Sequence, residues 1–162
     1  MIVVSDTTPL NYLVLIHSID VLVKLFQEVY VPPSVVAELI RPKAPEIVRA
    51  WAQSPPDWLK IQSPSVRLAS TFVLDDGEAD ALSLAKELHI TDILIDERRG
   101  RNIAQQEGLI PIPTLAVLER AAAQNLLDLR TALARLQQTT IRIPLDRIQA
   151  ALDRDQARKR RN

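Results

Sequence analysis

The sequence alternates short apolar runs with longer stretches of helical periodicity, and this alternation restricts the fold more than any other feature. Four of these runs are rich in Val, Ile or Leu and are followed by Pro, Asp or Ser, whereas Leu59-Lys60-Ile61 indicates a strand by its alternation. Short runs of this kind are typical of strands buried in a parallel sheet. Strands are predicted at residues 2–4, 29–31, 59–61, 93–95 and 110–112. Because helical segments separate them and no Asn-Gly turn occurs, we expect an α/β sandwich with a mostly parallel central sheet.

Helix boundaries are predicted from caps and breakers. Thr8, Ser34 and Thr114 each stand where a hydroxyl could cap a helix. Asp75 followed three residues later by Glu78 resembles a capping box. Helices are expected at residues 10–16, 20–26, 34–41, 45–53, 75–88, 98–107, 114–123, 126–138 and 145–158.

Composition narrows the class of protein. A chain of 162 residues fits one domain. It has no cysteine, which excludes disulfides, thiolate zinc sites and a cysteine nucleophile. No apolar run approaches the roughly 20 residues of a membrane span, and the first residues do not resemble a signal peptide. We therefore expect a cytoplasmic protein without membrane attachment.

Two of the predicted strands end in an aspartate. Asp6 follows the first strand and Asp96 follows the strand at 93–95. Carboxyl ends of parallel strands share one edge of the sheet, and ligands bind there where the strand order reverses. Either residue could instead cap the next helix. For Asp6 this is disfavoured because Thr8 is the better cap, whereas Asp96 or Glu97 could simply begin the following helix.

Further acids on predicted helices could join this edge. Glu38 lies on the helix at 34–41, although an isolated acid there is usually solvated. Glu78 and Asp80 lie in the first turns of another helix, where the helix dipole alone favours acids. Glu78 already has a place in the capping box, so Asp80 is the freer ligand. Helical spacing does not decide between them.

Gathered carboxylates indicate a bound cation. Two like charges about 4 Å apart repel by about 4 kcal/mol at an effective dielectric near 20. A divalent ion relieves this repulsion, and oxygen ligands without His or Cys favour Mg²⁺ or Mn²⁺. Such an ion activates water and offsets charge on a phosphate, so the expected chemistry is phosphodiester hydrolysis.

Four motifs in order resemble those of PIN-domain proteins, in particular a VapC-like branch. They are DTTPL at residues 6–10, PPSVVAEL at 32–39, DGEADALSLA at 76–85 and ILIDERR at 93–99. The likeness spans residues 1 to about 118. It implies a three-layer α/β/α fold and a Mg²⁺- or Mn²⁺-dependent ribonuclease. It also implies a toxin role with a cognate antitoxin, and a homodimer.

Site residues follow from the resemblance position by position. The implied catalytic acids are Asp6, Glu38, Asp80 and Asp96, with Asp6, Asp80 and Asp96 on the metal. Thr7 or Thr8 would match the hydroxyl residue that supports the metal shell, and Glu78 is the alternative acid on its helix.

The last motif departs from the family pattern. Many relatives have Thr-x-Asp after this strand, so here the fourth acid is Asp96, Glu97 or neither. The adjacent Arg98, Arg99 and Arg101 either contact the RNA backbone or neutralise nearby acids. We expect residues 1–140 to form the PIN-like domain, with a C-terminal helix and basic tail at 141–162 as its extension.

Two other functions fit parts of the pattern. A phosphatase of the haloacid dehalogenase type also begins with a strand ending in Asp, but it needs an acid where Thr8 stands. A non-catalytic module would bind nucleic acid or an antitoxin without using the carboxylates.

Overall fold

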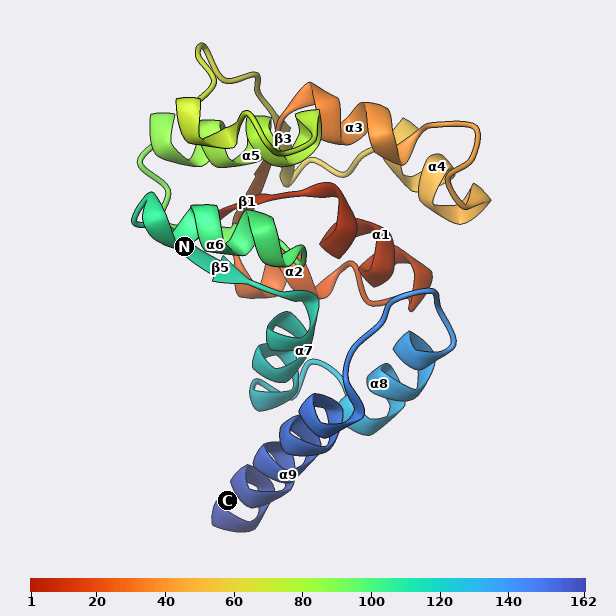
Figure 1. Ribbon diagram of the computed structural model, residues 1–162. Coiled ribbons are helices and arrows are strands. Elements are labelled where there is room, and N and C mark those ends of the chain that lie inside the picture. The colour runs from red at the N-terminus through yellow and green to blue at the C-terminus, as the bar shows by residue number, and fades with distance from the viewer.

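Five parallel strands form one sheet at the centre of the molecule (Figure 1). The computed structural model describes residues 1–162. The strands are β1 (Ile2–Ser5), β2 (Glu28–Val31), β3 (Leu59–Ile61), β4 (Asp92–Leu94) and β5 (Ile110–Ile112). Their order in the sheet is β3-β2-β1-β4-β5, and every neighbouring pair is parallel. All five predicted strands and the parallel arrangement are thereby confirmed, with the proline-bearing β5 at an edge.

Nine α-helices and one 3₁₀-helix connect and cover the strands. The 3₁₀-helix is η1 (Ala69–Thr71). The α-helices are α1 (Thr7–Leu15), α2 (Val21–Leu25), α3 (Pro33–Leu39), α4 (Glu46–Gln53), α5 (Asp76–Glu87), α6 (Arg98–Gln106), α7 (Thr114–Ala123), α8 (Leu129–Gln137) and α9 (Leu145–Arg161).

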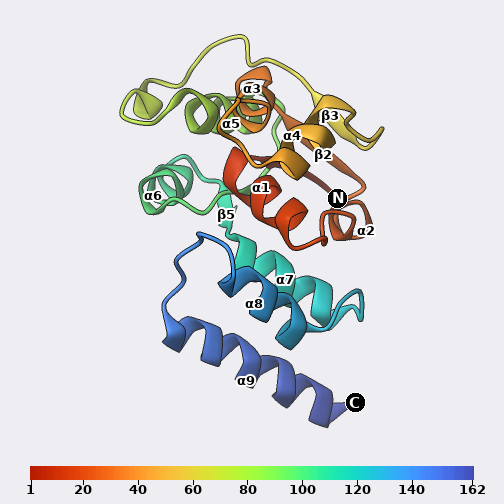
Figure 2. The same ribbon diagram turned by 90° about the vertical axis from the view of Figure 1, so that its right-hand side faces the viewer.

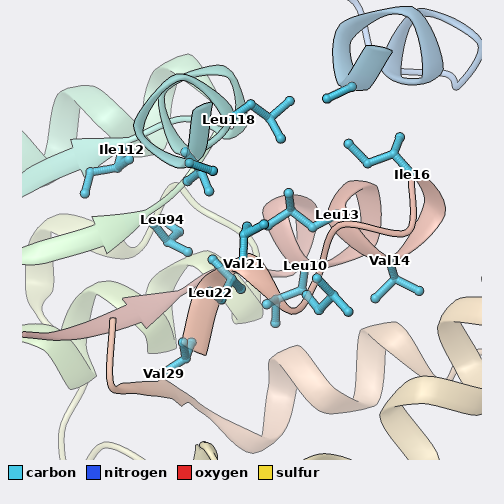
Figure 3. Packing of buried hydrophobic residues seen from close by; sticks show 14 of the residues in the cluster. Leu10, Leu13, Val14, Ile16, Val21, Leu22, Val29, Leu94, Ile112 and Leu118 are labelled. Atoms are coloured by element: carbon cyan, nitrogen blue, oxygen red, sulfur yellow. The ribbon is translucent and has the colours of Figure 1, made fainter. Parts of the chain in front are cut away.

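The two faces of the sheet bury different side chains. Val4 and Ile93 belong to a cluster with apolar residues of α5 and α6. Val3 and Leu94, one residue along each strand, belong to the larger cluster with α1, α2 and α7. Figure 3 shows part of this larger cluster, including Leu118 of α7. Because successive strand residues point to opposite faces, helices cover both, and the α/β/α arrangement is confirmed.

The strand order reverses between β1 and β4. From β1 the chain proceeds outward through β2 to β3, and it then returns to place β4 on the other side of β1. Ser5 pairs with Leu94, and the Asp6 N–H donates to the Leu94 carbonyl at 2.9 Å. Asp6 therefore lies at the carboxyl edge of the sheet, where the ligand-binding crevice of an open parallel sheet forms.

Three predicted hydroxyl caps are wrong. The helix α1 begins at Thr7 with Asp6 in the cap position, so Thr8 lies inside its first turn. Ser34 and Thr114 lie in the first turns of helices that Pro32 and Pro113 precede. The fixed φ of proline suits a helix start, and both hydroxyls are used in tertiary hydrogen bonds instead.

The predicted cap at Asp75 is confirmed. The Glu78 N–H donates to Asp75 Oδ1 at 2.8 Å. The last two helices differ from their predicted bounds, since Asp128 caps α8 and α9 extends to Arg161.

The helices α7, α8 and α9 form a group beside the sheet, and α9 is its outermost member (Figure 2). Ile148 and Ala151 of α9 are buried in the same cluster as the sheet residue Val3. The C-terminal helix therefore packs onto the core of the domain. None of the helices combines the length and the apolar composition needed to cross a bilayer.

Candidate functional site

Acidic side chains from three elements gather at the carboxyl edge of β1. Asp6 comes from the end of β1, Glu38 from α3 and Glu78 from the first turn of α5. The helices α3 and α5 pack against each other beside this edge (Figure 1). Charge interactions link these acids, because Glu78 and Glu38 both raise the pKa of Asp6. We call Asp6, Glu38 and Glu78 the acid group.

Asp6 is the most buried member of the acid group. It is 3% exposed, and its Oδ1 is buried without a hydrogen-bond partner. Burial raises the pKa of Asp6 well above its usual value, and the charges of Glu78, Asp75 and Glu38 raise it further. The backbone N–H of Thr7 offsets part of this rise. A carboxylate left so short of partners is a place where a cation would be favourable.

Glu78 is buried beside Asp6 and is 6% exposed. Burial, followed by the charges of Asp75 and Glu97, raises its pKa to about 7. The Asp75 backbone N–H opposes the rise, as expected of a capping box. Glu78 therefore takes part in the cap and in the acid group at once. Its place in the cap therefore does not keep Glu78 out of the acid group.

A hydrogen bond positions the Glu38 side chain, and the missing side chain of a neighbouring glycine leaves it room. Thr7 Oγ1 donates to Glu38 Oε2 at 2.6 Å. A Cβ atom added to Gly77 would lie 2.5 Å from Glu38 Oε1. Glycine at this position therefore leaves room for the Glu38 carboxylate, which a Cβ atom would displace. Of the two hydroxyl candidates, Thr7 is the one that contacts the acid group.

The structure places Asp80 outside the acid group. Its carboxylate accepts hydrogen bonds from Ser34 Oγ at 2.6 Å and from Arg67 Nε at 2.7 Å. Arg67 also pairs with Asp76 at 3.0 Å. Residues two positions apart on an α-helix point about 200° apart around its axis, so Glu78 and Asp80 face different surroundings. The charge of Asp80 already has a cation, whereas that of Glu78 has none.

Asp96 is engaged at the start of α7. It accepts hydrogen bonds from the Thr114 N–H at 2.8 Å and from the Thr114 hydroxyl at 2.6 Å. Burial raises its pKa, while these bonds and the charge of Arg101 lower it. Its neighbour Glu97 is exposed, and the charge of Glu97 raises the pKa of Glu78. Of the two adjacent acids, Glu97 is therefore the one linked to the acid group.

The three predicted RNA-contacting arginines divide into two kinds. Arg98 and Arg99 are exposed on the first turn of α6, whereas Arg101 is half-buried near Asp96. None of the three forms an ion pair. They are therefore free to meet another anion, and their contact with RNA remains a prediction.

The family to which this chain belongs follows from a comparison of its sequence with known protein families. A family model described as a PIN domain matches residues 2–157. The chain belongs to the PIN-domain family. No curated protein and no solved structure matches it. PIN domains are in general nucleases that use divalent metal ions, so membership supports a nuclease acting on nucleic acid at that general level.

The acid group of this PIN domain has the donor chemistry of a hard divalent cation. Its donors are carboxylate oxygens, and no lysine or arginine pairs with Asp6, Glu38 or Glu78. The unpartnered Oδ1 of Asp6 is a specific position where such an ion would supply the missing contact. No three acidic or histidine side chains are arranged so that they could hold one metal ion together. Side-chain rotation would have to bring the remaining ligands to it.

Sequence reasoning missed two residues of this PIN domain that matter to the site. The sequence pattern predicts only a helix cap for Asp75, yet its charge raises the pKa of both Asp6 and Glu78. The pattern predicts no role for Gly77, although its missing Cβ makes room for Glu38. The cluster of acids around a glycine at residues 75–78 was the available signal for both.

Proposed function

We propose that this PIN domain is a Mg²⁺- or Mn²⁺-dependent endoribonuclease. The observation that carries the proposal is the acid group itself. Asp6 is buried with an oxygen that has no partner, and its neighbours are other acids rather than cations. Such crowding raises the free energy of the folded protein unless a positive charge enters, so its presence favours a cation site over a structural role.

The residues have distinct tasks in this proposal. Asp6, Glu38 and Glu78 would hold the ion, and Glu97 is the candidate fourth acid. A bound divalent ion supplies charge that offsets the phosphate and makes water more acidic. Thr7 orients the Glu38 carboxylate, and Gly77 leaves it room. Asp80 and Asp96 act elsewhere, through their partners in α3 and α7.

Protonation of Glu78 links the site to pH. With a pKa of about 7, the Glu78 carboxyl holds a proton in a large share of molecules near neutral pH. Ligand carboxylates must be ionised, so Glu78 gives up that proton when the ion binds. Metal affinity should therefore rise with pH up to slightly alkaline conditions.

The proposal extends to a toxin of a toxin–antitoxin pair, cytoplasmic and dimeric, with a cognate antitoxin that covers the site. The support for this part is the VapC-like order of motifs in the sequence. Expression of the chain alone should arrest growth, and Asp6→Asn should relieve the arrest. Equal arrest by both proteins would contradict a toxin role that depends on the acid group.

Asp6→Asn tests the nuclease proposal. The substitution keeps the shape of the side chain and removes the charge that holds the ion. Altering an outer residue of a metal site typically costs about 10- to 100-fold, so loss of a direct ligand should lower Mg²⁺-dependent RNA cleavage by at least about 100-fold.

Asp20→Asn is the matched control, because Asp20 is exposed and caps α2 without a side-chain hydrogen bond. It should cleave RNA like the wild type. Wild-type cleavage rates in Asp6→Asn, or undiminished wild-type cleavage with a chelator present, would contradict the proposal.

A further inference from the structure

A second feature of the same sheet edge is a basic pocket beyond the ends of β4 and β5. Its volume is about 190 Å³. Its charged walls are Asp96, Arg101, Arg142 and Arg147, and its apolar walls include Leu115. We call this cavity the arginine pocket. Neither Arg142 nor Arg147 belongs to the family motifs found in the sequence.

No ion pair and no side-chain hydrogen bond engages the arginines of the arginine pocket. None of its three arginines forms an ion pair. The Nε of Arg101 is buried and lacks a hydrogen-bond acceptor. The one acid in the lining, Asp96, is already engaged by the N–H and hydroxyl of Thr114. Three guanidinium groups against one engaged carboxylate leave the pocket short of negative charge.

Two helices begin at the arginine pocket. Pro113 precedes α7 and Pro144 precedes α9, and both prolines line the cavity. The N-terminus of an α-helix carries a partial positive charge and free N–H groups that favour anions. Asp96 already accepts the Thr114 N–H at the start of α7, whereas no side chain caps α9, a helix of 17 residues. The start of α9 therefore adds to the field of the arginines and favours a compact anion such as a phosphate.

The first turn of α6 lies between the arginine pocket and the acid group. On one side, a Cβ added to Gly100 would lie 3.4 Å from Glu78 Oε1. On the other side, Arg101, the next residue, lines the pocket. An extended polynucleotide crossing this turn would therefore reach both places with neighbouring parts of its backbone.

We propose that the arginine pocket binds a backbone phosphate of the RNA next to the phosphodiester that is cleaved. This proposal rests on the nuclease function and adds a substrate-positioning subsite to it. Arginine binds phosphate oxygens through two parallel N–H donors, which suits a fixed phosphate better than lysine would. An acidic segment of a protein partner would use the same charges, but the position beside the acid group favours the substrate.

Arg142→Gln combined with Arg147→Gln tests the subsite. Both side chains are exposed and unpaired, so the double variant should keep the wild-type melting temperature. Binding of a labelled single-stranded RNA is measured by fluorescence anisotropy with a chelator present, at several salt concentrations. We expect affinity to fall by about tenfold or more. The slope of log affinity against log salt should weaken by about 0.7, the value for one phosphate of a single strand.

Arg120→Gln combined with Arg130→Gln is the matched control. It removes the same charge from exposed arginines outside the pocket, and it should bind RNA within about twofold of the wild type at moderate salt. In cleavage assays with metal, the pocket variant should raise KM with kcat nearly unchanged, since it removes binding common to substrate and transition state.

Failure of this inference and failure of the nuclease function give different results. Wild-type cleavage with no change in RNA affinity or KM in the pocket variant would overturn the subsite alone. If the wild-type protein binds RNA through the pocket but does not cleave it, the proposed nuclease function is wrong and the pocket is still an RNA-binding site. If the variant instead loses binding only to a poly-glutamate peptide, the pocket serves an acidic protein partner and the inference is wrong.

Discussion

Glu78 and Asp80 lie two residues apart on α5, yet their surroundings are opposite. Glu78 is 6% exposed, is surrounded by other acids, and has its pKa raised to about 7. Asp80 accepts a hydrogen bond from Ser34 and pairs with Arg67. The difference teaches that a local density of acids does not define a metal site. What defines it is negative charge that the protein itself leaves without a cation.

Asp96 and Glu97 repeat the comparison at the end of β4. Asp96 accepts hydrogen bonds from the N–H and hydroxyl of Thr114 at the start of α7, so its charge stabilises the fold. Glu97 is exposed and has no ion-pair partner, and its charge acts on Glu78. In both pairs, the acid that is engaged by other groups is the one that sequence reasoning preferred as a ligand.

The largest expected effect separates Glu78 from Asp80 by activity. Glu78→Gln should lower metal-dependent RNA cleavage by about 100-fold, because a ligand of the ion is lost. Asp80→Asn should keep cleavage within about threefold and lower the free energy of unfolding by about 1 kcal/mol, since it weakens a partly exposed ion pair and one hydrogen bond. Initial cleavage rates and urea unfolding of both variants measure the two effects.

The contrast between Glu78 and Asp80 is wrong if the two variants show the opposite activities. Full activity in Glu78→Gln with a 100-fold loss in Asp80→Asn would restore the ligand set predicted from the sequence. It would also imply that Asp80 leaves Arg67 when the ion binds.

The next effect is a pH dependence of stability in the absence of divalent ions. The folded-state pKa of Glu78, about 7, lies above its ordinary value of 4.5, and that of Asp6 is raised as well. Between these values the folded state binds more protons than the unfolded state, so stability falls as pH rises from about 4.5 to 7. The loss should be about 1–3 kcal/mol.

Thermal unfolding with a chelator, between pH 4.5 and 8, measures this loss. Glu78→Gln should make the curve shallower and leave the part that comes from the raised pKa values of Asp6 and Asp96, whereas Asp80→Asn should keep the wild-type slope. The acids with lowered pKa values, Asp128 and Asp155, lose their contribution only near or below pH 4, outside this window. Wild-type stability that increases from pH 5 to 7.5 would count against a crowded acid group.

Much of the fold could be predicted from the sequence because its signals are local. Short runs rich in apolar residues located four strands, alternation in Leu59-Lys60-Ile61 located β3, and the helical segments between them favoured parallel pairing. Proline in β5 indicated an edge strand. The position of Asp6 at the carboxyl edge followed from the same pattern, without knowledge of any tertiary contact.

The identity of the remaining ligands could not be predicted because it depends on distant partners. Arg67 neutralises Asp80 from an irregular segment whose path no periodicity reveals. Thr114 engages Asp96 from the start of α7, which follows α6 and β5 in the chain. The predicted cap at Ser34 is wrong because of a distant partner too, since the Ser34 hydroxyl donates to Asp80 rather than capping its own helix.

The smallest effect concerns the close approach of α5 to Glu38. Gly77→Ala should displace the Glu38 carboxylate, because the new Cβ would lie 2.5 Å from Oε1. Cleavage should fall by about tenfold, at the low end of what a small misplacement in a site costs. Stability should not fall, since the displaced atom ends a flexible side chain and alanine favours helix.

A double-mutant cycle isolates this effect. Gly77→Ala should add almost nothing to the loss caused by Glu38→Gln, because both act through one carboxylate. Additive losses would show that Gly77 acts through some contact other than Glu38.

Binding of Mn²⁺ to the purified protein, followed by isothermal titration calorimetry in two buffers of different ionisation enthalpy, tests the central claim without any substrate. We expect the wild type and Asp80→Asn to bind the ion and to release protons near pH 7, and Asp6→Asn and Glu78→Gln to bind at least about tenfold more weakly. Equal binding by all four proteins, or no binding by the wild type, would contradict the account.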